Sequence, residues 1–198
     1  MGYIDAGAFH GLSSLNELVL SHNEITSLER LMFDGVDQLQ SLWLDDNSIN
    51  LMEDKVFEQL HQLEQLDLSA NELSVLTPEN LLGLNSLQQL ILRNNSMAMI
   101  GANTFVYVAQ LRKLDLSDNV IEKLSQKAFA GLDRLQRLDL MNNRIVSFDV
   151  DVFAELPALN LLDLKGNRLT SLGQSTFAPL WSNWMNVTAA LYLNGIYC

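Results

Sequence analysis

Residues 39–49 read LQSLWLDDNSI, and this stretch decides the fold because its pattern recurs along the chain. Leucine stands at its first, fourth and sixth positions and asparagine at its ninth. The same four residues return every 24 residues, without an insertion, in seven consecutive units. The units begin at Leu15, Leu39, Leu63, Leu87, Leu111, Leu135 and Leu159. The chain is therefore an array of repeats, and positions 1 to 24 are numbered within each unit below.

Four later positions of the unit, 11, 14, 19 and 22, are apolar throughout. Position 19 is phenylalanine in six units and Leu81 in the third. The period of two in LxxLxL predicts a short strand, and the later apolar positions bring the chain back across the same core. One unit cannot bury its own leucines, so neighbouring units must share a continuous core. We expect stacked coils with parallel strands.

The asparagine at position 9 stands where each predicted strand ends and the chain turns. Its amide offers two donors and an acceptor, which can satisfy backbone groups that the turn would leave buried and unpaired. Because the residue recurs in every unit, we expect the asparagines to form a ladder along the stack.

The pattern LxxLxLxxNxLxxLxxxxFxxL resembles the leucine-rich repeat, in the 24-residue form typical of extracellular animal proteins. The resemblance covers residues 15 to about 180 and extends to variable lymphocyte receptors and Toll-like receptor ectodomains. It implies an α/β fold, a curved, horseshoe-like solenoid with a parallel β-sheet on its concave face. Ligands of such proteins commonly bind to that face.

The whole chain, residues 1–198, is expected to form one solenoid domain. Residues 1–14 supply a partial repeat, residues 15–182 the seven full repeats, and residues 183–198 a degenerate last repeat or the start of a cap. In that last segment, Leu191 and Leu193 predict a strand in a shifted register. The aromatic residues expected to cover the open end of the core are Trp181, Trp184, Tyr192 and Tyr197.

Cysteine usage departs from the family pattern, since the resemblance implies disulfide-bonded caps and the chain has only Cys198. Either the chain is a fragment, or its ends are covered in another way. A third alternative is that exposed ends pair two chains, because open strand edges and apolar patches favour association. The residues predicted for such a homodimer are Trp181, Trp184 and Tyr192.

Composition excludes several classes of partner. A formal net charge of −12 opposes binding to nucleic acid. No apolar run is long enough to span a bilayer. The opening MGYIDAGAF lacks the basic and apolar segments of a secretory signal, so we expect an ectodomain or a fragment of a secreted protein. An intracellular scaffold, suggested by the missing disulfides, is the alternative.

Positions 3, 5, 7 and 8 should point out of the concave face, because side chains alternate across a strand. The first units place Val19 and Trp43 among acidic residues, and the later units place basic residues among aspartates. The predicted ligand-binding residues are Val19, Trp43, Asp45, Asp67, Ile91, Arg93, Lys113, Asp115 and Arg137. The plain alternative is that Asp67 and Asp115 follow the family consensus and that neighbouring charges form surface ion pairs of at most about 1 kcal/mol.

Trp43 departs from the aspartate that four of the seven units carry at position 5. Exposed aromatic residues beside aliphatic ones are enriched in binding hot spots. The competing interpretation is ordinary packing on the same face against Val19 and the stem of Asp67. Trp43 is therefore the first candidate for a ligand contact.

Neither catalysis nor a cofactor is expected. Ser21, His22 and Asp46 form the one imaginable catalytic cluster, but it would be open to water and without an oxyanion site. A calcium site at His22, Asp45 and Asp46 lacks the ligand spacing of a calcium loop, so no metal site is predicted.

Two sequons, at Asn94 and Asn186, predict glycosylation and support secretion weakly. The resulting functional hypothesis is a non-enzymatic module that binds a protein or glycan on its concave face, in the manner of an innate-immune receptor. The alternative is a matrix or cell-surface adhesion protein that makes homotypic contacts through its ends.

Overall fold

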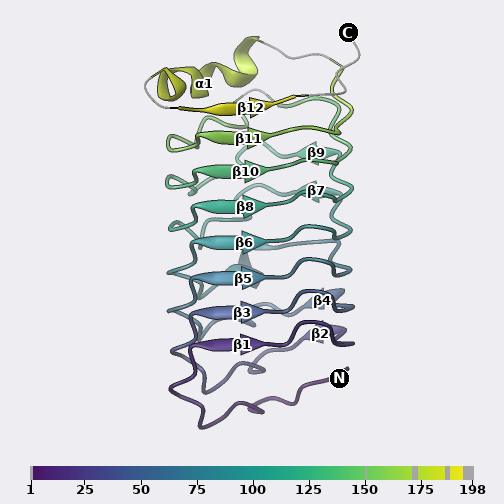
Figure 1. Ribbon diagram of the computed structural model, residues 1–198, viewed down its shortest axis with the longest axis vertical. Helices are drawn as coiled ribbons and strands as arrows, with labels where there is room; N and C mark the ends of the chain where they lie inside the picture. The colour runs from purple at the N-terminus through teal and green to yellow at the C-terminus, as the bar shows by residue number, and fades with distance from the viewer. Residues whose placement is uncertain (1, 150, 171–173, 186–187, 194–198) are drawn as a thin grey trace.

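The computed structural model describes residues 2–149, 151–170, 174–185 and 188–193. The chain forms a stack of coils that runs from the purple N-terminal repeats to the yellow C-terminal segment (Figure 1). One three-residue strand from each coil enters an eight-stranded parallel sheet. Its strands are β1 (Glu17–Val19), β3 (Ser41–Trp43), β5 (Gln65–Asp67), β6 (Gln89–Ile91), β8 (Lys113–Asp115), β10 (Arg137–Asp139), β11 (Leu161–Asp163) and β12 (Ala190–Tyr192). The predicted solenoid with a parallel sheet along one face is confirmed.

The register of the sheet follows the sequence repeat. Val19 pairs with Trp43 and Trp43 with Asp67, so equivalent positions of successive units lie side by side. The last pairing differs, because Asp163 lies opposite Tyr192 and the offset is 29 rather than 24 residues. The predicted last strand in a shifted register is thereby confirmed at Leu191, which pairs with Leu162.

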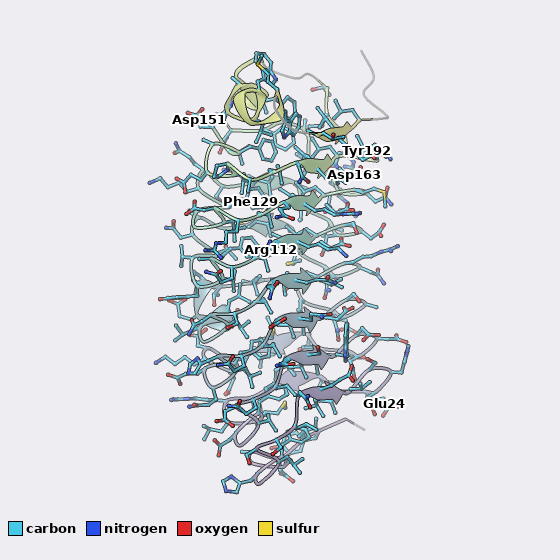
Figure 2. All side chains as sticks on the ribbon, turned by 60° about the vertical axis from the view of Figure 1, so that its left-hand side comes forward. Glu24, Arg112, Phe129, Asp151, Asp163 and Tyr192 are labelled. Carbon is cyan, nitrogen blue, oxygen red and sulfur yellow. The ribbon has the colours of Figure 1, made fainter. Side chains whose placement is uncertain are left out.

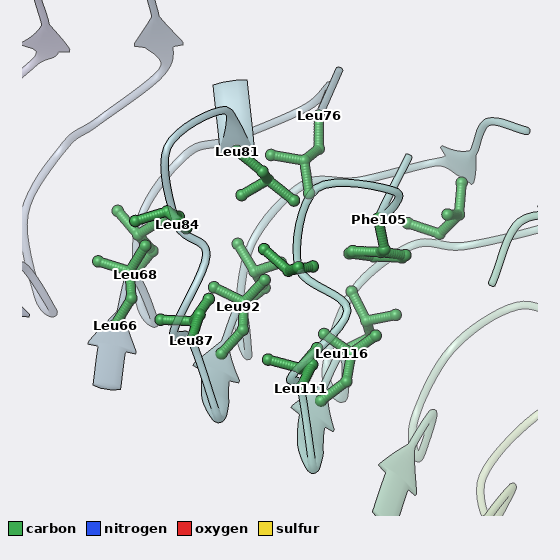
Figure 3. Close-up of a cluster of buried hydrophobic side chains, with 14 of the residues drawn as sticks. Leu66, Leu68, Leu76, Leu81, Leu84, Leu87, Leu92, Phe105, Leu111 and Leu116 are labelled. Carbon is green, nitrogen blue, oxygen red and sulfur yellow. The ribbon is translucent and has the colours of Figure 1, made fainter. Parts of the chain in front are cut away.

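The repeated apolar positions form one continuous core. Figure 3 shows Leu66 and Leu68 beside Leu84 from the return side of the same coil and Leu87 of the next coil. The phenylalanines at position 19 stack on one another, with ring centroids about 6 Å apart, as for Phe33 with Phe57 at 5.7 Å and Phe105 with Phe129 at 6.2 Å. Leu81 stands between these two runs of aromatic rings and is fully buried.

The asparagine ladder is confirmed, and Asn95 shows how each rung works. Its Nδ2 donates to the carbonyl of Leu92 in its own coil (3.2 Å) and to that of Leu68 in the preceding coil (2.9 Å). Its Oδ1 accepts the backbone N–H of Leu73 at 2.9 Å. Each amide therefore ties the turn of one coil to the turn of the coil before it.

Two small parallel sheets lie on another side of the stack, where the chain continues after the ladder asparagine of each coil. The first pairs β2 (Ser27–Leu28) with β4 (Leu51–Met52), and the second pairs β7 (Met99–Ile100) with β9 (Lys123–Leu124). The third coil, whose residues are all described, adds no strand between them and instead forms a 3₁₀ helix, η1 (Pro78–Leu81). Thr77 and Asn80 close a capping box at its start, and Asn80 Nδ2 also donates to the carbonyl of Met52 at 3.1 Å.

An α-helix, α1 (Gln174–Trp184), covers the C-terminal end of the core (Figure 1). Phe177 and Leu180 of this helix are buried, as their repeat positions 19 and 22 predict. The sequence pattern did not predict the helix itself, since Pro179 lies inside it and proline disfavours a helix interior. Among the described residues, no helix is long and apolar enough to cross a membrane.

Candidate functional site on the sheet face

The outer surface of the eight-stranded sheet is the candidate site and is called the sheet face. Leucines at positions 4 and 6 point into the core, so positions 3 and 5 point outward. Figure 2 shows Asp163 and Tyr192 on this side of the stack, Phe129 in the interior and Asp151 on the opposite side. The two halves of the sheet face differ in chemistry.

Trp43 dominates the N-terminal half of the sheet face. It lies between Val19 and Asp67 in the sheet, and its indole Nε1 donates a hydrogen bond of 2.9 Å to Glu17 Oε1 on β1. Val19 beside it is 62% exposed. The hydrogen bond orients the indole and satisfies its polar atom, while an apolar surface remains open to a ligand.

The predicted acidic neighbours of Trp43 are held by residues of the first coil. Ser21 Oγ donates to Asp45 Oδ1 at 2.5 Å, and His22 Nδ1 lies 2.5 Å from Asp46 Oδ2. Ser21 is therefore paired with Asp45 rather than with His22, and the imagined catalytic cluster is not assembled. Across the described residues, no group of three or more His, Cys, Asp or Glu is arranged to hold a metal ion.

The aspartates at position 5 have a local structural role. Asp67 Oδ1 accepts the backbone N–H of Ser69 at 2.8 Å and its hydroxyl at 2.6 Å. Asp115 binds Ser117 in the same way, at 3.0 Å and 2.6 Å. These carboxylates thus close the turn that follows each strand, a role that the sequence pattern did not predict.

Asp139 continues this column and is almost buried, with 6% of its surface exposed. Alternation across the strand predicts an open position here, but Arg137 Nη2 lies 3.3 Å from its Oδ2 and the backbone N–H of Met141 donates to its Oδ1. Burial raises the pKa of the Asp139 carboxyl, and the neighbouring carboxylates of Asp115 and Asp163 raise it further. The hydrogen bonds from Met141 and Arg137 lower the pKa, but their effect is smaller. The position-5 column therefore carries closely spaced carboxyl groups that are partly shielded from water.

Arg93 and Lys165, in the C-terminal half of the sheet face, are held by neighbouring side chains. Arg93 Nε donates to Asp118 Oδ2 at 2.8 Å, and Asn142 Nδ2 donates to the other oxygen of that carboxylate at 2.8 Å. Lys165 Nζ lies 4.0 Å from the centre of the Tyr192 ring. Ile91 on β6 and Lys113 on β8 are half-buried. The predicted ligand-binding residues thus lie on one face, but in two clusters.

Of the two sequon asparagines, only Asn94 lies among the described residues. Asn94 is exposed at the turn after β6, where its φ of 54° places it in the left-handed region. It borders a shallow hollow lined by Ser69, Ala70, Arg93 and Asp118. Asn186 lies outside the described residues, as do Tyr197 and Cys198.

The three aromatic residues predicted for self-association differ in how exposed they are. Trp184 packs against the core, and its Nε1 donates to the carbonyl of Leu159 at 2.7 Å. This contact agrees with the prediction that it covers the core, and it leaves only part of the indole available to a second chain. Trp181 and Tyr192 remain exposed.

Comparison with known proteins decides the family. The family described as Leucine rich repeat matches residues 3–49, 37–97, 87–145 and 133–182, which together reach nearly from end to end. The chain belongs to the leucine-rich repeat family. No curated protein matches it.

Among solved structures, this leucine-rich repeat chain is similar to the crystal structure of a TLR13–ssRNA13 complex. The two share 25% sequence identity and a TM-score of 0.75, over 98% of this chain and 31% of the other. The chain therefore spans about a third of that protein's length. In all, 441 chains of solved structures match it, so the fold is widespread and cannot by itself decide the ligand.

Proposed function

We propose that this protein is a non-enzymatic recognition module that binds a protein or glycan ligand on the sheet face, as part of a secreted or cell-surface receptor of the innate-immune type. The observation that carries the proposal is the pair of adjacent side chains on the outside of β1 and β3, the exposed Val19 and the half-buried Trp43. The stack does not require either side chain, because other units place a turn-closing aspartate at this position.

The chemistry around this pair supports a macromolecular ligand. Aromatic residues that are oriented and partly desolvated in the free protein lose little entropy on binding, and they dominate interface energies. Glu17 accepts the indole N–H of Trp43, and Asp45 and Asp46 follow at the end of β3, where Ser21 and His22 hold them. A ligand segment that presents an apolar group beside a basic group complements this surface.

The family and the structural neighbour supply further support. The neighbouring protein was crystallised with single-stranded RNA, so RNA is the second candidate ligand. Arg93, Lys113 and Arg137 offer basic groups on the same face, but a net charge of −12 opposes a polyanion. We therefore expect a protein or glycan to bind more tightly than RNA at physiological salt.

A panel of secreted receptor ectodomains, microbial glycans and an RNA oligonucleotide tests the proposal by surface plasmon resonance. Trp43→Ala should weaken the captured interaction by about 2 kcal/mol, roughly thirtyfold. Tyr107→Ala is the matched control, because it removes an exposed aromatic residue from the return side. Equal effects of the two variants would refute the proposed site, and preferential RNA binding that weakens steeply with salt would favour the second candidate.

The adhesion alternative rests on Trp181, which is exposed on the helix that covers the C-terminal end. It predicts that Trp181→Ala abolishes contact between copies of the chain while Trp43→Ala leaves that contact intact. Analytical ultracentrifugation of the two variants separates adhesion from recognition.

A further inference from the structure

Three successive coils carry an exposed aliphatic side chain at position 13, away from the sheet face. Leu51, Val75 and Met99 are 56%, 67% and 52% exposed. Leu51 begins β4 and Met99 begins β7, on the side of the stack where these strands are labelled in Figure 1. The next residue in each coil is buried, so position 13 points to solvent. These three residues are called the lateral stripe.

The stack does not require an apolar residue at position 13. The coils before and after the lateral stripe place Ser27 and Lys123 there, in strands of the same length. A single exposed aliphatic residue is ordinary on a protein surface, but adjoining ones make a continuous apolar patch, and such patches mark contact sites.

Most of the residues that flank the lateral stripe are short. They are Asn50, Ser74 and Ala98 at position 12, and Glu53, Thr77 and Gly101 at position 15. Glu53 is the one long side chain among these six, and its Oε2 accepts the backbone N–H of Arg30 in the preceding coil at 2.8 Å. Beside Val75 and Met99 no long flanking side chain stands between the stripe and an approaching surface, so the strip fits another flat surface rather than an inserted side chain.

We propose that the lateral stripe is the centre of an interface with a second copy of this chain, in which the two stacks run antiparallel. A two-fold axis in the interface and across the stacks would place Val75 against its equivalent and Leu51 against Met99 of the other copy. Each apolar residue of the stripe then meets an apolar residue.

Charge at the ends of the lateral stripe selects the antiparallel arrangement. Lys123 lies at one end, and Ser27 with Glu29 lies at the other, where Ser27 Oγ is 3.4 Å from Glu29 Oε1. Antiparallel stacks bring the Lys123 ammonium near Glu29 of the other copy. Parallel stacks would instead place the two Lys123 side chains against each other, which is repulsive.

The size of the lateral stripe sets the expected affinity. The surface area of three side chains is smaller than the roughly 800 Å² that each partner buries in a standard interface, so flanking polar residues must complete the contact. We therefore expect a reversible dimer whose population rises with protein concentration in the micromolar range.

Sedimentation velocity of the whole chain over a concentration series tests the proposal. Val75→Lys should raise the dissociation constant of the dimer at least about tenfold, because two ammonium groups would meet on the axis. The variant should fold, since Lys123 occupies the equivalent position of another coil. Leu31→Lys is the matched control: Leu31 is exposed off the stripe, and Lys55 and Lys127 hold the equivalent position with the same backbone conformation.

Cross-linking tests the orientation, in a Cys198→Ser background. Leu51→Cys mixed with Met99→Cys should form a disulfide between chains, whereas neither variant alone should do so. Cross-linking of Leu51→Cys with itself would overturn the antiparallel arrangement. Native protein that stays monomeric throughout, or a dimer that Val75→Lys leaves intact, would overturn the interface itself.

Discussion

The indole Nε1 of Trp43 donates a hydrogen bond of 2.9 Å to Glu17 Oε1, joining the most conspicuous aromatic residue of the sheet face to the neighbouring strand. This contact shows how a large, half-buried side chain is held in place on the sheet face. It also makes the orientation of the indole depend on one carboxylate.

Glu17→Ala should therefore shift the indole N–H resonance of Trp43 and speed its exchange with solvent, whereas Glu17→Gln, which keeps an acceptor, should change it less. The loss in unfolding free energy should stay below about 1 kcal/mol, because the hydrogen bond is exposed. Trp43→Phe assigns the resonance among the three tryptophans. An unchanged resonance in Glu17→Ala would contradict the contact.

Removal of one rung of the asparagine ladder should be costly. Asn95→Ala leaves the backbone N–H of Leu73 without its acceptor and removes one of the two amide donors from each of the Leu68 and Leu92 carbonyls, and we expect a loss of about 3 kcal/mol in urea unfolding. Asn94→Ala is the matched control, because Ala70 adopts the same backbone conformation at the equivalent position, with φ of 52° against 54°. Bacterial expression keeps both proteins free of glycan. Equal losses from the two substitutions would argue against the ladder.

Gly83 should tolerate no side chain. Its φ is +101°, and a Cβ atom there would lie 2.4 Å from the carbonyl oxygen of Phe57 and 2.6 Å from Glu58 Cα. Because the clash is with backbone of the preceding coil, Gly83→Ala should cost more than about 2 kcal/mol. Gly101→Ala, whose Cβ would meet only Thr104 Oγ1 at 3.4 Å, should change stability by less than about 1 kcal/mol. Thermal unfolding of the two variants measures the difference.

The buried Asp139 predicts a pH dependence with a defined sign. Its pKa is raised in the folded state, chiefly by burial, so the folded protein holds this proton more tightly than the unfolded chain. The stability gained from the neutral form is present at pH values below the unfolded pKa and is lost as the pH rises through the folded pKa. Asp139→Asn, which stays neutral, should therefore gain stability over the native protein at pH 7.

The comparison between pH 7 and acid is the measurement that isolates this effect. The stability gain of Asp139→Asn should shrink as the pH falls, because the native aspartate is then protonated as well. The exposed Asp133→Asn serves as the control for a general change in net charge. A gain that grows toward acid would mean that the ion pair with Arg137 outweighs burial.

Glycosylation at Asn94 can be tested on protein secreted from animal cells. The side chain is exposed in a left-handed turn, and the hydroxyl-bearing Ser96 of its sequon is exposed as well. Mass spectrometry should detect a glycan that Asn94→Gln removes. Protein that carries no glycan at this residue would withdraw the support that the sequon lends to secretion.

Most of the fold could be predicted from the sequence, because a repeat multiplies each local signal. Leu42 and Leu44 alone would be weak evidence for a strand, but the same spacing in seven units leaves one consistent register. The donors and acceptor of Asn47 predicted its role at the turn for the same reason. The predicted last strand at Leu191 was found from its leucines, although the repeat had already ended.

The sheet face was predicted less completely, because its side chains choose among several partners. Alternation across the strand placed Asp67 and Asp115 on the surface, but their bonds to the following turns depend on backbone geometry. Ser21 had both His22 and Asp45 within reach in principle, and it pairs with Asp45. The lateral stripe was missed although its signal was present, since reading position 13 down the units gives Leu51, Val75 and Met99 in succession.

The sequence by itself determined the solenoid, the core and the ladder, because repeated leucines and asparagines leave neighbouring coils one way to bury apolar surface and pair backbone groups. Only the tertiary structure decided what happens where repetition stops. The helix α1 forms over the last full coil despite Pro179, since Phe177, Leu180 and Trp184 gain a core to cover. The burial of Asp139 and the half-buried position of Trp43 were likewise decided by the neighbours that stacking brought to each residue.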